Sequence, residues 1–350
     1  MASTSQSWQQ GSAQTERKNP VLSREFGDRF IADAAKLFEA HGTTDFSPDK
    51  LGECYQHGQP CKVYPTHGVA KGSLRCNISG ISCLDWTSRG LEVGVFGKGA
   101  LAFLTLMWDF CAGLYDVGVL ECTRKYRHQH IQTLLGPYGF CVYPVVFSPW
   151  MIGFPCNRFR KYMVVINTKT VSWNDGAALD LNKLLGLLGR SVNMTGSVYL
   201  EDTQKAEIRA AIEKMAQDRH MPLRDGNRKR WPMSAVLPTG LKTLLSRHLE
   251  SMKEKGVDTD SDVFTTIDQN PTHANWTEYI PALLQNSHVY SFKHKRLLLP
   301  QEHCKIMGLP WCKAFEELSG GKVKSLTGNA MHAGALAAVV LYTLGNIGTV

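Results

Sequence analysis

Apolar residues follow two different periods in the first half of the chain. Residues 24–40 carry apolar side chains at three- and four-residue intervals, and this spacing predicts an amphipathic helix. Residues 100–113 predict a second, strongly apolar helix, and residues 124–135 predict a basic amphipathic one. Short apolar runs at 74–81, 115–122, 140–147 and 158–167 predict β-strands. Strands that alternate with helices are typical of an α/β fold with a parallel sheet.

The second half of the chain has a different texture. Residues 179–188, 201–215 and 240–255 predict helices, several with basic residues, and Pro300 and Glu302 mark a further helix start. Residues 333–344 predict a buried apolar helix, while residues 1–20, rich in Ser, Gln and Thr, predict a disordered tail. We therefore expect a first domain over residues 21–168, a smaller lobe over 169–319, and a segment over 320–350 that returns to the first domain.

Composition narrows the functional classes. The 350 residues carry a formal net charge of +8, which suits a polyanionic partner without establishing one. Ten cysteines without a Cys-x-x-Cys pair, and a polar N-terminus without an apolar signal segment, favour a reducing, intracellular compartment. No run of about 18 apolar residues is present, so we expect no membrane span.

A cysteine at a predicted strand end is the first candidate for chemistry. The run NISGISCLDWTSRG leads from a strand into Ser82-Cys83 and then into a polar, glycine-punctuated loop. Active sites of open α/β sheets lie at the carboxyl ends of strands, and a thiolate is a strong nucleophile. A buried, inert cysteine is the alternative, because free cysteine is among the most buried residue types.

A second cysteine-containing segment raises the possibility of zinc. Cys54, His57, Cys61 and His67 form a C-x2-H-x3-C-x5-H array, and all four are zinc ligands in other proteins. The spacing is not that of a common zinc finger. We therefore predict no metal site and keep a zinc-stabilised binding module as an alternative.

Five segments follow one another in a specific order along residues 74–344, although each alone is a weak signal. They are Ser82-Cys83 with Ser88 in the loop that follows, Glu121-Cys122-Thr123, Cys156-Asn157-Arg158-Phe159-Arg160, Arg296 through Glu302 to Pro310, and Gly328-Asn329-Ala330-Met331. Together they resemble the cytosine-C5 DNA methyltransferase family. In the same order, that family has Pro-Cys before a serine-containing mobile catalytic loop, Glu-Asn-Val, Gln-x-Arg-x-Arg, Arg-x-Leu…Glu…Gly-Phe-Pro and Gly-Asn-Ala-Val.

The resemblance implies a Rossmann-like methyltransferase sheet and an enzyme that transfers a methyl group from S-adenosylmethionine to C5 of a flipped cytosine. It makes Cys83 the nucleophile that attacks C6. It gives Glu121 the task of holding the base edge and protonating N3. It has Arg158 and Arg160 orient the base, a task that suits a planar guanidinium.

The resemblance also implies binding residues. Ser82, Gly328 and Asn329 would contact S-adenosylmethionine, and residues 169–319 would form a target-recognition lobe. DNA is the expected partner, RNA stays possible, and a eukaryotic member would act in the nucleus. The expected nucleic-acid contacts are Arg296, Arg228, Lys229 and Arg230, with Lys293 and Lys295 as further phosphate contacts.

The match departs from the family at the cofactor. No Phe-x-Gly-x-Gly loop precedes Cys83, and residues 23–41 are similar to the family's second strand and the helix after it, so we expect a sheet without its first strand. A catalytically inactive protein that binds nucleic acid is therefore the second hypothesis. Structural roles also stay open, as an exposed strand end for Glu121, a salt-bridge stripe for Arg158 and Arg160, and a plain turn at Gly328-Asn329.

Overall fold

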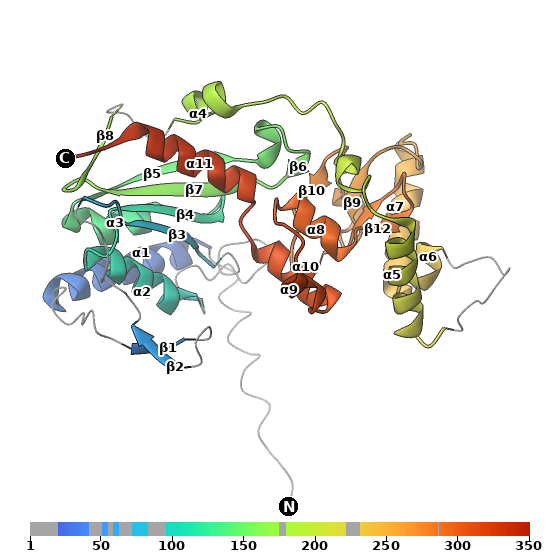
Figure 1. The fold of residues 1–350 in the computed structure, drawn as a ribbon, viewed down its shortest axis with the longest axis horizontal. Helices are drawn as coiled ribbons and strands as arrows, with labels where there is room; N and C mark the ends of the chain where they lie inside the picture. The colour runs from blue at the N-terminus through green and yellow to red at the C-terminus, as the bar shows by residue number, and fades with distance from the viewer. Residues whose placement is uncertain are drawn as a thin grey trace, which may run out of the picture. The chain divides into compact units, whose positions relative to one another are not determined.

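The computed structural model describes residues 20–41, 51–54, 59–62, 72–82, 96–97, 99–174, 180–221, 232–285 and 287–350. The chain forms two compact units, and each is described by itself. Unit 1 comprises residues 1–145, 161–179 and 343–350, and unit 2 comprises residues 146–160 and 180–342. Both units combine helices and strands (Figure 1), which confirms the predicted α/β class.

A four-stranded mixed sheet forms the centre of unit 1. Its order is β3-β4-β7-β5, and β3 and β4 run parallel. Thr168 N donates to Gly139 O at 2.9 Å and Asn167 N donates to Asp116 O at 2.9 Å, so the end of β7 lies beside the starts of β5 and β4. Strand β7 therefore runs antiparallel to both neighbours. The strands span Cys76–Gly80 (β3), Val117–Thr123 (β4), Phe140–Phe147 (β5) and Arg160–Asn167 (β7).

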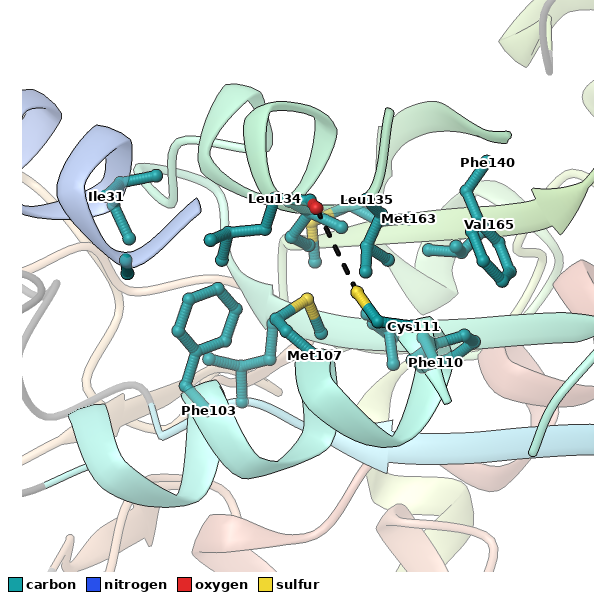
Figure 2. Packing of buried hydrophobic residues seen from close by; sticks show 14 of the residues in the cluster. Ile31, Phe103, Met107, Phe110, Cys111, Leu134, Leu135, Phe140, Met163 and Val165 are labelled. Carbon is teal, nitrogen blue, oxygen red and sulfur yellow. Dashed lines mark hydrogen bonds between the residues drawn. The ribbon is translucent and has the colours of Figure 1, made fainter. Parts of the chain in front are cut away.

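Three helices pack on one face of this sheet. They are α1 (Pro20–His41), α2 (Ala100–Cys111) and α3 (Gln129–Leu135). Figure 2 shows α2 side chains such as Phe103 and Met107 meeting Leu134 of α3 and Met163 of β7, all fully or nearly fully buried. Gly118 of β4 makes this approach possible, because a Cβ there would lie 2.5 Å from the Phe110 ring.

Helix α1 corrects one expectation. The strand predicted at the start of residues 23–41 is wrong, because the whole segment is helical. Its buried residues Ile31, Ala34 and Phe38 follow helical spacing, and that periodicity decides the structure. The predicted helix at 124–135 is shorter than expected, since residues 124–128 form a turn before α3.

Two smaller sheets complete unit 1. Strands β1 (Leu51–Cys54) and β2 (Gln59–Lys62) form an antiparallel pair. Strands β8 (Val171–Trp173) and β13 (Ile347–Thr349) form a second antiparallel pair, which brings the end of the chain onto this unit.

Unit 2 is made of short strands and several helices around its own apolar clusters. The predicted helices at 179–188, 201–215 and 240–255 are confirmed as α4, α5 and α7. Helix α11 (Ala333–Asn346) begins in unit 2 and ends in unit 1; it is not wholly buried as expected, since Leu341 and Leu344 are exposed. The other elements are α4 (Leu181–Leu188), α5 (Lys205–Gln217), α6 (Met233–Val236), α7 (Thr239–Glu254), α8 (Pro300–Ile306), α9 (Lys313–Glu316), α10 (Gly320–Asn329), β6 (Cys156–Asn157), β9 (Phe264–Thr266), β10 (Ile280–Pro281), β11 (Val289–Ser291) and β12 (Arg296–Leu297).

None of the helices in the described part of the chain is long and apolar enough to cross a membrane.

Candidate functional site

The carboxyl ends of β3 and β4 lie side by side. Gly80 pairs with Glu121, and Ile81 N donates to Glu121 O at 2.8 Å. The Cys122 thiol contacts Ser82 O at 3.9 Å. The exposed Ser82 therefore sits beside the strand end that carries Glu121, as parallel pairing requires. Cys83, the next residue in the chain, lies outside the described residues.

Glu121 and Arg160 lie on the same face of this sheet and at the same end of it, where β4 ends and β7 begins. Leu120 and Cys122 of β4 point into the helix-covered core, so the Glu121 side chain points to the opposite face. Met163 and Val165 of β7 point into the same core, which puts Arg160 on the Glu121 face. Because β7 runs antiparallel to β4, it begins at the edge where β4 ends. The Glu121 side chain is only 6% exposed, so it is not the exposed strand terminus of the alternative interpretation.

Arg158 lies outside the strand that the sequence predicts for it. It falls between β6 and β7, and its guanidinium is 2% exposed. Nη1 donates to Leu283 O at 2.6 Å, and Nη2 donates to Gly328 O at 3.1 Å and Ala330 O at 2.8 Å. The predicted stripe of Arg158 and Arg160 on one strand face is therefore wrong. Arg158 binds the last carbonyls of α10 within unit 2.

Gly328 and Asn329 differ in accessibility. Gly328 is buried, and a Cβ at this position would lie 2.4 Å from Gln285 N, so glycine is required for backbone packing. Its carbonyl is already bound by Arg158. Asn329, the last residue of α10, is exposed. The plain-turn alternative fails, because both residues are helical.

The cysteine that precedes Arg158 by two residues is inert. Cys156 is fully buried, and burial raises the pKa of its thiol to about 12. Such a thiol stays protonated near neutral pH and is a poor nucleophile.

The expected nucleic-acid contact at Arg296 is wrong. Its side chain is 4% exposed and forms a bidentate ion pair with Glu302, with Nη1–Oε2 at 2.9 Å and Nη2–Oε1 at 2.6 Å. Leu299 N and Thr203 Oγ1 also donate to Glu302, at 2.7 Å and 2.6 Å. This network joins β12 to the first turn of α8, so the guanidinium cannot reach a phosphate.

The other predicted basic contacts have mixed outcomes. Lys293 and Lys295 lie in the exposed turn between β11 and β12, and each is 3.1 Å from an aspartate, Asp262 and Asp260 respectively. Arg228, Lys229 and Arg230 lie outside the described residues.

The zinc alternative rests on two histidines, His57 and His67, that lie outside the described residues. Cys54 and Cys61 belong to the β1–β2 pair. Among the described residues, no group of three or more His, Cys, Asp or Glu side chains is placed to hold a metal ion.

Sequence reasoning missed Lys161. It is the second residue of β7, and its Nζ donates to Tyr126 O at 2.5 Å in the turn that follows β4. Burial lowers the pKa of its ammonium group. The available signal was its place at the start of a strand, directly after an arginine that the motif had singled out.

Comparison with known proteins assigns no family to this chain. No family model matches the chain, and no curated protein matches it. Solved structures that resemble it include an Entamoeba histolytica methyltransferase, EhMeth, at 13% identity over 77% of both chains with a TM-score of 0.46. The S. pombe Dnmt2 methyltransferase matches at 12% identity over 77% of both chains with a TM-score of 0.44. A Spodoptera frugiperda DNMT2 mutant matches at 13% identity, over 77% of this chain and 79% of that one, with a TM-score of 0.42. These three TM-scores are below 0.5, so the likeness supports no conclusion about the fold or the activity of this chain.

Proposed function

We propose that this protein is a DNA (cytosine-5-)-methyltransferase that activates a flipped cytosine through a covalent bond to Cys83. The observation that carries the proposal is the parallel pairing of β3 and β4. It holds Ile81 and Ser82, the two residues before Cys83, beside the end of β4, with Ile81 N and Glu121 O only 2.8 Å apart. A nucleophile and a proton donor are the two groups that attack on C6 requires.

The residues on this edge suit the first chemical step. The Cys83 thiolate would form a bond to C6, and the C5–C6 double bond would open. The displaced electron pair is then shared between C5 and the ring, and a proton from Glu121 to N3 offsets the charge. Arg160, on the same face of the sheet as Glu121, would hold the polar edge of the base through its planar guanidinium. Arg158 contributes by positioning, since Nη1 and Nη2 of its guanidinium donate to three backbone carbonyls.

S-adenosylmethionine is the methyl donor in this proposal, and the described residues do not build a complete site for it. Ser82 and Asn329 are accessible, whereas Gly328 is closed by backbone packing. Among the described strands, none lies beside the outer edge of β3, where a parallel neighbour would supply a cofactor floor. We therefore derive no step that passes through the cofactor.

Trapping of the covalent bond tests the proposal. The wild-type protein, mixed with DNA containing 5-fluorocytosine and S-adenosylmethionine, is expected to give a protein–DNA adduct that survives denaturing electrophoresis. Cys83→Ser should abolish the adduct, and Cys76→Ser should leave it unchanged, because Cys76 is an exposed cysteine at the opposite end of β3. No adduct with the wild-type protein would refute the enzyme. An RNA oligonucleotide of the same sequence decides between the two nucleic acids.

The incomplete cofactor site favours a second candidate, an inactive methyltransferase-like protein that binds nucleic acid. This candidate predicts salt-dependent affinity for nucleic acid that Cys83→Ser leaves unchanged, and no adduct with 5-fluorocytosine. Under either candidate, the place of action would be the nucleus if the organism is eukaryotic. Staining with an antibody against the protein tests that location.

A further inference from the structure

A short basic turn directly follows the strand that carries Glu121. Strand β4 ends at Thr123, and residues 124–128 connect it to α3. Thr123 and Tyr126 are buried, whereas Arg124 and Lys125 between them are exposed. The Tyr126 side chain is 1% exposed and meets the Phe103 ring edge-on at 6.2 Å. Packing on both sides therefore fixes the backbone from which the two exposed basic side chains extend.

Contacts from three directions hold the backbone of this turn. Tyr126 N donates to Thr123 O at 3.0 Å, and Lys161 Nζ donates to Tyr126 O at 2.5 Å. Arg127 forms an ion pair with Asp28 of α1 at 2.7 Å. The Asp28 carboxylate balances the charge of Arg127, while Lys161 adds a positive charge under the turn. A fixed backbone with cationic side chains on its outer side is suited to an anionic partner.

We propose that Arg124 and Lys125 bind the DNA phosphates that flank the target base. This inference rests on the proposed function, because Glu121 must hold the base. Arg124 follows Glu121 by three residues, a span of at most about 10 Å even when fully extended. Neighbouring phosphates of one strand are separated by about 3.4 Å along the helix axis, so a base held by Glu121 brings the phosphates on either side of it near the turn.

Arg296, the contact that the sequence motif offered, is buried in its ion pair with Glu302. The basic turn is exposed and lies at the sheet edge that carries Glu121. It therefore offers phosphate contacts that the motifs of the sequence did not single out.

The salt dependence of binding tests this role. Affinity for a labelled mixed-sequence DNA duplex is measured by fluorescence anisotropy from 50 to 300 mM KCl. Each lost phosphate contact lowers the slope of log K against log[KCl] by about 0.9 and the affinity by about eightfold at 0.1 M salt. We expect the Arg124→Gln/Lys125→Gln protein to lose about 1.8 from the slope.

A matched control carries the same charge change elsewhere in unit 1. Lys36→Gln/Lys169→Gln removes two exposed cations. Lys36 belongs to α1, and Lys169 belongs to the turn after β7, at the end of the sheet opposite to Glu121. The control is expected to keep the wild-type slope within about 0.3.

Each outcome separates this inference from the proposed function. If the basic-turn variant keeps the slope of the control while the wild-type protein forms the 5-fluorocytosine adduct, the inference is wrong and the enzyme stands. If the slope falls as expected but no adduct forms, the phosphate contacts stand and the enzyme is refuted. Polyglutamate is then added to the complex at the same concentration of charges as the DNA. If it displaced the DNA, the inference would also be overturned, because the turn would then bind any polyanion.

Discussion

Substitution of Arg158 is expected to lower the stability of the protein, whereas substitution of Arg160 is expected to abolish the adduct with little change in stability. Arg158 is buried and donates to three backbone carbonyls, whereas Arg160 is half-buried at the start of β7. Arg158→Met keeps most of the apolar stem and removes the side-chain hydrogen bonds to the three carbonyls. Arg160→Met makes the same chemical change two residues away, so it is a matched control.

The loss at Arg158 follows from the groups left behind. Three carbonyls, of Leu283, Gly328 and Ala330, would lose their shared donor, and an unsatisfied buried polar group costs about 1–3 kcal/mol. Partial access of water to the end of α10 reduces that cost, so we expect about 4 kcal/mol for Arg158→Met. Total stabilities of domains are about 5–15 kcal/mol, and 1 kcal/mol shifts the melting temperature of a domain of this size by about 2–4 °C. The melting temperature should therefore fall by about 10 °C.

Thermal unfolding followed by circular dichroism, with the adduct assay alongside, separates the two roles. Arg160→Met is expected to change stability by less than about 1 kcal/mol, as partly exposed substitutions usually do, and to abolish the adduct. Arg158→Lys should recover part of the stability, because an ammonium group still donates to some of the carbonyls. If Arg158→Met had the melting temperature of the wild-type protein but formed no adduct, Arg158 would act in the chemistry, and its positioning role through the three carbonyls would be refuted.

Three further predictions concern unit 2. Burial lowers the pKa of His303 to about 3 from an ordinary 6.5, so the unfolded chain binds the proton more readily than the folded one. The free energy of unfolding should therefore fall as the pH drops below 6.5, by about 2 kcal/mol at pH 5. In urea unfolding measured at a series of pH values, His303→Leu should remove most of this fall. Glu302→Gln leaves the buried Arg296 without its charge partner and should lower the free energy of unfolding by about 3–5 kcal/mol. A double-mutant cycle with Arg296→Met should show strong coupling between the two residues, and additive losses would contradict the ion pair. Gly328→Ala should lower the free energy of unfolding by about 1–3 kcal/mol in urea titrations, because the added Cβ would collide with the backbone of Leu284 and Gln285. An unchanged midpoint would show that the backbone at Leu284 and Gln285 shifts to make room.

Local periodicity made the elements around the site predictable. All seven residues of β4 are buried, which matches the short continuous apolar run that predicts an inner strand. Glu121 could be found because it stands near the end of that run, and the end of a strand lies at the end of the sheet, where active sites of α/β folds lie. The helix at Pro300 was also predictable, since Glu302 at its third position accepts from Leu299 N as an N-terminal carboxylate does.

The roles of the basic residues were not predictable in this way. Arg158 leaves the strand because its own amide donates to Ser148 Oγ at 2.8 Å and because β6 pairs with β10, which is more than 100 residues away in the chain. Arg296 is buried because a strand and the next helix bring Glu302 against it. The burial of Arg158 therefore depends on a pairing between distant segments, which a residue motif does not contain, whereas Arg296 and Glu302 stand six residues apart in one motif that does not itself show their ion pair.

The alternation of side chains along a strand then explains why the motif arginines differ. Arg160 is the first residue of β7, so the burial of Met163 and Val165 fixes its face, and that face is the one with Glu121. Arg158 precedes the strand, and no such rule applies to it. A loss of activity on substituting Arg158 would therefore report first on the integrity of α10, whereas the same loss at Arg160 with unchanged stability would report on the sheet edge where Cys83 follows β3.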